Sequence, residues 1–394
     1  MNRLATLSPL QSFLLLASIT VSFLAGAVAP TPLYPQYQAQ WGFTPLTITV
    51  IFGIYALAVL LALLFLGRLS DHVGRRPVLV AALAAQVVAM LLFASADGLA
   101  LLLVARVVQG LSVGAALGAV GAGLLDVDKQ RGALANALTP PIGTALGGIV
   151  AGVVVSLAPA STAFIYLLYA GFFLLQGVAM LWMRETFAPR RGALASLRPQ
   201  FSFSPETRAP LLHGAPIIIA AWIVAGFYAS LGPALLRNLT GGNSPLLSGF
   251  ALFVMAGSGA ATVLLLQRQT PHRVMRTGAV ALALGSMLVI AALALHSAAL
   301  FFAGLMVSGA GFGGGFQGAV RSILARVHAN ERAGVLSVIF VIAYLAMGLP
   351  AITAGYLLLQ SGDLPGVVRE FGIAIALLAL FPIVAQRLSR ATSS

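Results

Sequence analysis

Runs of about 20 apolar residues recur along the whole chain and constrain the fold more than any other feature. An α-helix rises 1.5 Å per residue, so a run of this length crosses the roughly 30 Å hydrocarbon core of a bilayer. The runs lie at 10–30, 47–67, 77–95, 99–124, 133–157, 162–183, 214–236, 246–267, 277–296, 299–322, 333–358 and 366–387. Lipid cannot satisfy stray backbone groups, and a β-barrel would show short alternating segments instead. The sequence predicts an all-α integral membrane protein with twelve transmembrane helices.

Composition agrees with a chain that is surrounded by lipid. Hydrophobic residues make up 60% of the sequence and charged residues only 8%, whereas soluble domains carry about a quarter charged residues. The chain has no Cys, which excludes disulfides and thiolate metal sites. We expect no cofactor and no metal.

The net charge of +13 is explained by membrane topology and does not require nucleic acid as a partner. The loops expected on one side carry most of the cations, among them Arg68, Arg75, Arg76, Lys129, Arg131, Arg184, Arg190, Arg198, Arg273, Arg276 and Arg332. Only Arg237 and Arg369 fall on the other side. The positive-inside rule then predicts a multi-pass protein of the cell inner (plasma) membrane with both termini in the cytoplasm.

The chain resembles itself at a fixed separation. Arg75 and Arg276, and Arg131 and Arg332, are each 201 residues apart, as are Gly110 and Gly311. Two parallel six-helix bundles would produce this pattern. We expect an N-terminal bundle at 1–184, a cytoplasmic central loop at 185–212 that is rich in Pro, Arg and Ser, and a C-terminal bundle at 213–394.

The most specific motif is the sequence GRLSDHVGRRPVLV in the loop after the second predicted helix. Its characteristic positions are Gly67, Asp71, Gly74, Arg75 and Arg76. A carboxylate here can neutralise an Arg or a helix N-terminus, while the arginines remain at the headgroup level. The motif closely resembles the signature loop Gly-x-x-x-Asp-x-x-Gly-Arg-Arg of the major facilitator superfamily. The resemblance implies twelve helices in two bundles, transport by alternating access, and a charge-relay latch formed by this loop.

Arg106 lies deep within a predicted transmembrane helix. A guanidinium in the bilayer costs at least about 2.5 kcal/mol on insertion scales and is normally kept for a function or a partner. The sequence RVVQG that begins at Arg106 resembles a superfamily motif whose Arg is linked to proton transfer. A purely structural pairing of Arg106 with backbone carbonyls remains the alternative.

The fifth predicted helix contains Pro140, Gly143, Gly147 and Gly148, which allow a bend and close helix packing. The segment partly resembles the antiporter motif of the superfamily. Ala135, Thr139 and Thr144 stand where that motif has glycines, so generic helix packing is an equal explanation.

No predicted helix carries a central carboxylate, the usual means of binding cationic drugs and taking up protons. We therefore expect a neutral or anionic substrate. Proton coupling would have to use rim acids such as Asp71 and Asp126, His213 or the substrate itself. A substrate cavity is expected near the middle of the membrane, lined by polar and aromatic groups on different helices. Its candidates besides Arg106 are Tyr55, Gln109, Asn136, Trp222, Tyr228, Gln317 and Tyr344.

These features predict a monomeric secondary transporter of a small-molecule solute, most similar to the twelve-helix drug:proton antiporters, with efflux as the expected direction. One rival is a permease that takes up an organic anion or a sugar. An intramembrane enzyme is a rival of another class, since GLSVG around Ser112 matches a nucleophile motif, but the mid-helix context is wrong for it. A receptor or scaffold that transports nothing is a third.

Overall fold

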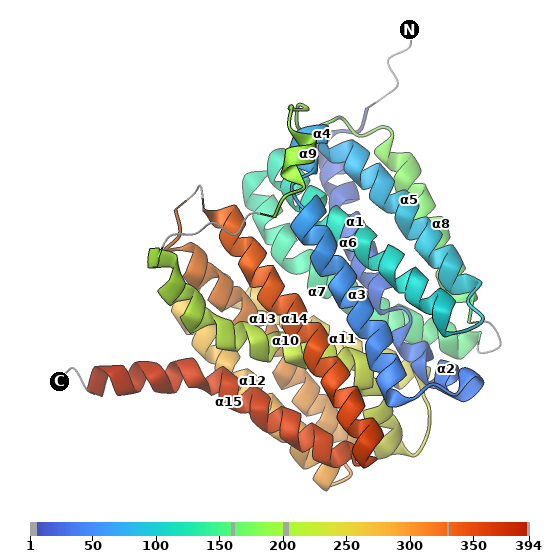
Figure 1. Cartoon of the computed structure of the whole chain (residues 1–394), viewed down its shortest axis with the longest axis vertical. Coiled ribbons are helices and arrows are strands. Elements are labelled where there is room, and N and C mark those ends of the chain that lie inside the picture. The colour runs from blue at the N-terminus through green and yellow to red at the C-terminus, as the bar shows by residue number, and fades with distance from the viewer. Residues whose placement is uncertain (1–5, 159–161, 200–204, 329–330, 392–394) are drawn as a thin grey trace. The chain divides into compact units, whose positions relative to one another are not determined.

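The computed structural model describes residues 6–158, 162–199, 205–328 and 331–391, and the regular secondary structure of this part of the chain is all helical (Figure 1). Eleven of the described helices are long and apolar enough to cross a membrane. A further apolar helix, α8 (Phe164–Met180), has 17 residues, which span about 26 Å and fall short of a typical hydrocarbon core. The all-helical membrane fold is confirmed, whereas the number of twelve spans stays a prediction.

The other helices have the following bounds: α1 Pro9–Val28, α2 Tyr34–Trp41, α3 Pro45–Leu66, α4 Ser70–Val73, α5 Arg75–Ala94, α6 Leu99–Val127, α7 Lys129–Leu157, α9 Ala193–Ser196, α10 Pro205–Thr240, α11 Pro245–Leu265, α12 Pro271–Ala294, α13 Ala298–Leu324, α14 Arg332–Ser361 and α15 Leu364–Ala391. The 3-10 helix η1 covers Thr31–Leu33. The two ends of the chain, for which a cytoplasmic location is predicted, lie outside the described residues.

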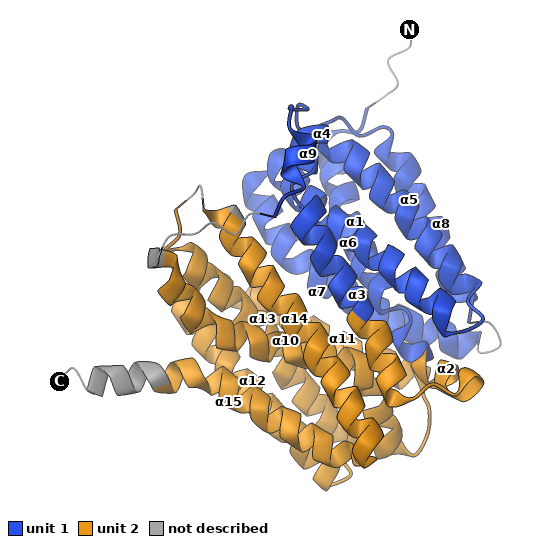
Figure 2. Cartoon of the chain, viewed as in Figure 1, with its two compact units in different colours: residues 1–33, 54–199 blue, residues 34–53, 200–394 orange. Residues whose placement is uncertain are grey.

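The chain forms two compact units, coloured separately in Figure 2. Unit 1 comprises Met1–Leu33 and Ile54–Pro199, and unit 2 comprises Tyr34–Gly53 and Gln200–Ser394. The change from one unit to the other falls within α3, so this helix belongs to both. The predicted bundles at 1–184 and 213–394, with their central loop, stay predictions.

Helical structure continues beyond the first apolar helix, which itself ends at Val28. Its predicted end lies near residue 30, where prolines begin, yet η1 and α2 continue the helical path to Trp41. Proline lacks an N–H but is tolerated in the first turn of a helix. Pro32 and Pro35 occupy such early positions in η1 and α2.

Small residues bring the helices of unit 1 close together. A Cβ atom at Gly143 or Gly147 of α7 would collide with the backbone of Val21 or Ala25 in α1. Gly148 is also buried, and Pro140 lies inside α7. The glycines predicted for helix packing therefore line a helix–helix contact, as small residues commonly do in membranes.

In each unit two glycines of one helix lie against the backbone of a neighbouring helix, a contact that we call the glycine seam. The number of residues between the corresponding glycines of the two units differs from the sequence repeat of 201 residues. Gly110 and Gly114 of α6 lie against the backbone of α3, at Tyr55 and Val59. In unit 2, Gly309 and Gly313 of α13 lie in the same way against α11. These pairs are 199 residues apart, whereas Gly311, 201 residues after Gly110, contacts Leu282 of α12 instead.

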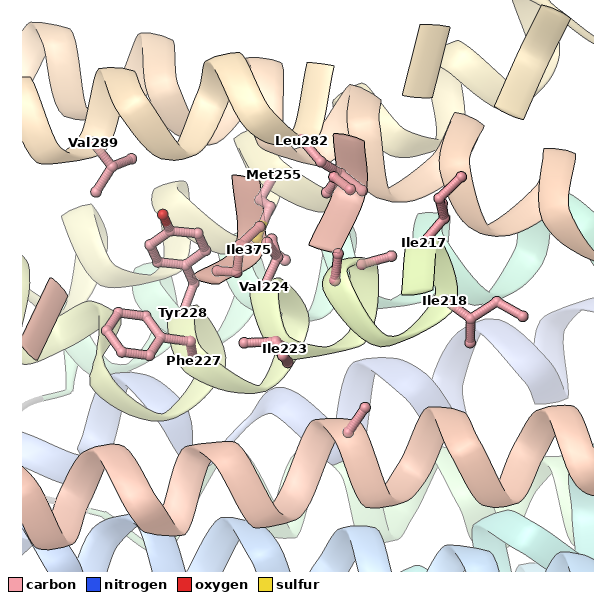
Figure 3. Packing of buried hydrophobic residues seen from close by; sticks show 14 of the residues in the cluster. Ile217, Ile218, Ile223, Val224, Phe227, Tyr228, Met255, Leu282, Val289 and Ile375 are labelled. Carbon is pink, nitrogen blue, oxygen red and sulfur yellow. The ribbon is translucent and has the colours of Figure 1, made fainter. Parts of the chain in front are cut away.

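The hydrophobic core of unit 2 is built around α10, whose buried side chains include Ile217, Val224 and Phe227 (Figure 3). Figure 3 also shows Tyr228 among these core residues. Its ring lies 5.6 Å from that of Phe227 and 6.4 Å from that of Phe301. The predicted cavity residue Tyr228 is thus placed within the core of unit 2.

Candidate functional site

The signature loop forms a compact charge cluster in unit 1. Arg75 is buried at the start of α5, and its guanidinium pairs with the Asp71 carboxylate. Its Nε donates to Asp126 Oδ2 over 3.2 Å, and its Nη1 donates to Ser70 Oγ over 2.8 Å. A buried guanidinium needs such a set of acceptors, because each unmatched N–H would lose its hydration. The arrangement connects the signature loop to the end of α6.

Glu185 completes this cluster from the segment after α8. Its carboxylate accepts from the backbone N–H of Arg75 (2.8 Å) and of Arg76 (3.0 Å). Gly74 precedes α5 and has no side chain to cap it, so Glu185 satisfies the free N–H groups of the first turn. A carboxylate at a helix N-terminus is also favoured by the helix dipole.

Two further contacts hold the same end of unit 1 together. Arg76 donates through Nη2 to Leu181 O over 2.6 Å, and the Phe187 ring lies 4.8 Å from the guanidinium carbon of Arg75. The Thr186 hydroxyl donates to Asp126 Oδ2 over 3.1 Å. We call Asp71, Arg75, Arg76, Asp126 and Glu185 the signature cluster. Of the predicted latch residues, Gly67 lies in the turn between α3 and α4.

Arg106 is fully buried within unit 1. Its Nη1 donates to Ala27 O over 2.9 Å and to Gln109 Oε1 over 2.7 Å. Gln109 in turn donates from Nε2 to Gly26 O over 3.0 Å. The Tyr55 ring lies 5.3 Å from the guanidinium carbon, within the range of a cation–π contact. Three predicted site residues, Arg106, Gln109 and Tyr55, are therefore brought together.

A second set of polar side chains continues from this group. Ser112 Oγ lies within hydrogen-bonding range of Gln86 Oε1 and of Gln109 O, and its single proton can serve either. On the same face of α1 as Gly26, Ser22 donates to Gln176 Oε1 over 2.8 Å. Gln86, Ser112, Ser22 and Gln176 are all buried. The polar interior of unit 1 therefore extends from α1 to α5, α6 and α8.

Trp222 and Tyr344 are the pair of predicted residues that meet in unit 2, with ring centroids 4.9 Å apart. Gln317, on α13, has a buried Oε1 to which the described residues offer no hydrogen-bond donor. Asn136 in unit 1 donates from Nδ2 to Gly121 O over 2.9 Å and so ties α7 to α6. The candidates thus separate into an arginine group, an aromatic pair and three isolated residues.

Unit 2 also contains a cavity of about 270 Å³ that the sequence did not indicate. It is lined by apolar side chains such as Ile48, Leu231 and Leu358, with Gln38 and Arg237 among its polar residues. None of the predicted cavity residues lines it.

The buried charges decide which ligands the interior tolerates. Among the described residues, Arg75 and Arg106 are the buried charged side chains, and no carboxylate is buried. Asp71 and Asp126 pair with Arg75, whereas Arg106 donates to neutral oxygens and lies beside the rings of Tyr55 and Phe93. The field around Arg106 therefore favours an anionic or neutral polar group over a cation.

Several of these residues were not identified from the sequence. Gln86 and Gln176 interrupt apolar helices, which is a usable signal, because an amide inside a membrane needs a partner. Glu185 follows the sixth predicted helix directly, but its position gives no indication that it reaches the N-terminus of α5. Phe312 and Phe316, whose rings lie beside Trp222, look like ordinary apolar residues in the sequence.

Comparisons with known proteins place the chain among membrane transporters. The sequence profile of the Major Facilitator Superfamily matches residues 14–351. An uncharacterised transporter of Escherichia coli, YebQ, is 27% identical over 201 residues, which are 50% of this chain and 42% of that protein. The match therefore spans less than half of the relative's length.

Solved structures with the same fold cover nearly the whole chain. A bacterial homologue of the human lysosomal transporter Spinster, in an inward-facing and occupied conformation, gives a TM-score of 0.73 at 14% identity, covering 95% of this chain and 96% of that one. A mutant of the nucleoside transporter NupG gives 0.68 at 15% identity, covering 95% and 99%. The human organic anion transporter MFSD10 (TETRAN) gives 0.68 at 16% identity, covering 94% and 99%. At these identities the likeness concerns the fold alone.

Proposed function

Because this chain belongs to the major facilitator superfamily, we propose that it is a secondary active transporter that moves a small organic solute by alternating access. We place it in the cell inner membrane with both termini in the cytoplasm, as the distribution of cations favours. We propose a monomer whose small-molecule substrate is exported in exchange for protons.

The substrate that we propose is neutral or anionic, and Arg106 carries this proposal. Its guanidinium is fully buried, and the described residues bury no carboxylate that could balance a cationic substrate. Bringing a second cation into this interior would be repulsive, whereas an anionic oxygen gains Coulomb energy. Two structural neighbours are a nucleoside transporter and an organic anion transporter, which agrees with this class.

Efflux and proton coupling rest on resemblance and on the placement of acids. The signature loop and the partial helix-five motif resemble the drug:proton antiporters of the superfamily. Asp71 and Asp126 both form ion pairs with Arg75 in the signature cluster. Protonating either acid would weaken these ion pairs at the N-terminus of α5. This provides a physical route by which a proton could change the stability of one transport state.

Transport assays in membrane vesicles distinguish proton-coupled efflux from uptake. A growth screen of an overexpressing strain against toxicants and nutrients first identifies a solute that the protein moves. Everted membrane vesicles are then energised to form an acidic interior, and the solute is added. A proton-coupled exporter consumes the proton gradient and accumulates solute inside these vesicles. Accumulation in right-side-out vesicles under an inward proton gradient would instead identify an uptake permease and overturn the efflux proposal.

The enzyme alternative has little support in the contacts of Ser112. Its hydroxyl lies beside Gln86 and the Gln109 carbonyl, and amide groups are not general bases. We expect Ser112→Ala to retain transport. A hydrolytic activity of the purified protein that is lost on this substitution would favour the enzyme instead.

A further inference from the structure

Four aromatic rings meet in unit 2, and we call Trp222, Phe312, Phe316 and Tyr344 the aromatic cluster. Trp222 on α10 lies 5.9 Å from Phe312 and 5.4 Å from Phe316 of α13, both edge-on. Its ring centroid is 4.9 Å from that of Tyr344 on α14. Spacings of this kind are the favourable ones between aromatic rings. Three helices therefore present aromatic faces to one another at a single place.

The position of the cluster along its helices sets it apart from an interfacial aromatic belt. Trp222 is the eighteenth of the 36 residues of α10, so it lies near the midpoint of that helix. Phe312 and Tyr344 are likewise close to the midpoints of α13 (Ala298–Leu324) and α14 (Arg332–Ser361). Belt tryptophans and tyrosines occur near helix ends, at the level of the lipid headgroups, where their polar atoms meet water. Trp222 is about 26 Å from either end of α10, which leaves its indole N–H far from that water.

The indole N–H of Trp222 has no acceptor among the described residues, although the nitrogen atom is buried. Trp can only donate, so the group cannot be satisfied in another way. A buried donor without a partner costs the desolvation of that group, and buried tryptophans normally have an acceptor. The Trp222, Phe312 and Phe316 side chains pack at the margin of the hydrophobic core of unit 2 and are only partly buried. The cluster therefore combines partly exposed aromatic side chains with an unused donor.

We infer that the aromatic cluster is the part of the transport site that recognises an aromatic solute bearing a carbonyl or carboxylate oxygen, with Trp222 Nε1 donating to that oxygen. Ring faces bind a planar aromatic group by stacking or edge-on contact, and one buried donor fixes its orientation. The inference rests on the proposed function, whose neutral or anionic substrate class it narrows. The proposed substrate class disfavours a quaternary ammonium solute because of its positive charge, whether or not that solute carries an acceptor.

The test uses the full chain, purified and held in lipid nanodiscs, with small matched probes. Equilibrium dialysis measures binding of four labelled probes. Nicotinate and nicotinamide carry an aromatic ring and an acceptor without a positive charge. Cyclohexanecarboxylate lacks the aromatic ring, and the 1-methylnicotinamide cation keeps ring and acceptor but adds a positive charge. We expect saturable binding of the first two and at least tenfold weaker binding of the others. Absence of binding by nicotinate and nicotinamide, or equal binding of all four, would overturn the inference.

Variants then distinguish the contribution of the Trp222 ring to binding affinity from that of its N–H group. Trp222→Phe keeps an aromatic face and removes the donor, so affinity should fall three- to tenfold, whereas Trp222→Leu should abolish binding. Trp182→Phe makes the same change at an exposed position of unit 1 and should bind as the wild type does. Unchanged affinity in folded Trp222→Phe protein would contradict the role of the N–H.

A fluorescence measurement provides an independent readout. The chain has three Trp residues, so the double variant Trp41→Phe, Trp182→Phe leaves Trp222 as the sole tryptophan. Nicotinamide should quench its emission along a saturation curve, and a purely linear, collisional dependence would contradict binding beside Trp222.

Failure of this inference is distinguishable from failure of the proposed function. If Trp222→Phe and Trp222→Leu move the solute found in the growth screen as well as the wild type does, the proposed transport function is retained and the inferred aromatic site is contradicted. If the wild-type protein moves no solute, the proposed transport function itself is contradicted.

Discussion

The Glu185 carboxylate occupies the place that a side chain at Gly74 would fill, and from there it accepts the first two backbone N–H groups of α5. Gly74 has φ 101° and ψ 157°, a conformation essentially reserved for glycine. The absence of a side chain therefore permits both the backbone path and the approach of the carboxylate. An acidic residue 111 positions away thus explains a glycine of the signature loop.

Gly74→Ala should destabilise the protein by about 1–3 kcal/mol, because it combines backbone strain with a collision at Glu185. Thermal unfolding in detergent, followed by intrinsic fluorescence, measures the loss. Gly98→Ala is the matched control, since Gly98 also precedes a helix but has an extended backbone and open space around its Cβ position. Equal unfolding temperatures for the two variants would contradict the account of Gly74.

Glu185→Gln should also lower the unfolding temperature, because the amide retains one oxygen but loses the charge that the α5 N-terminus favours. Exposed charges at helix ends are worth about 0.3–1 kcal/mol at low ionic strength, so the difference should shrink at high salt. Asp97→Asn, another exposed acid in unit 1, should change stability little. A loss that is independent of salt would indicate that packing, and not charge, is the contribution of Glu185.

Gly309→Ala should weaken unit 2 by forcing α13 away from the Met255 carbonyl of α11. Overpacking of a close contact typically costs about 1–3 kcal/mol. Gly232→Ala is the comparison, because nothing lies near its Cβ position. If Gly309→Ala is as stable as Gly232→Ala, the close seam between α11 and α13 is not formed as described.

Gln109→Leu should reduce transport at least tenfold and lower stability by about 1–3 kcal/mol, since it removes a partner of the buried Arg106 guanidinium. Initial rates in proteoliposomes and thermal unfolding are to be measured together. Gln130→Leu, at an exposed position of α7, controls for the loss of an amide. Full transport by Gln109→Leu would show that the Arg106 group has no part in moving the solute.

The helical membrane fold could be predicted from the sequence because it depends on local properties. Apolar runs of sufficient length and the lack of charge within them follow directly from the cost of exposing polar groups to lipid. The predicted end of the first helix near residue 30 agrees with the end of α1 at Val28, but the helical segments η1 and α2 after it were not predicted. A proline in the first turn of a new helix and a proline in a loop have the same local sequence signal.

The site was only partly predictable, since its contacts join distant segments. Arg106 and Gln109 are three residues apart on one helix, and their partnership follows from helical spacing. Tyr55 and the carbonyls of α1 reach Arg106 and Gln109 only through the packing of the helices. Glu185 reaches the signature loop in the same way. The glycine seam makes the same point, because a separation of 201 suggested Gly311 as the counterpart of Gly110, whereas the packing assigns Gly309.

Transport by purified protein in proteoliposomes, with Arg106 varied, tests the central claim most directly. The solutes are a matched series of one aromatic skeleton in neutral, anionic and quaternary ammonium forms, and the variants are Arg106→Lys, Arg106→Ala and the exposed control Arg273→Lys. We predict transport of the neutral or anionic form by the wild type and by Arg273→Lys, and at least a tenfold loss in both Arg106 variants. Rapid transport of the quaternary ammonium form that is unaffected by Arg106→Ala would contradict the account.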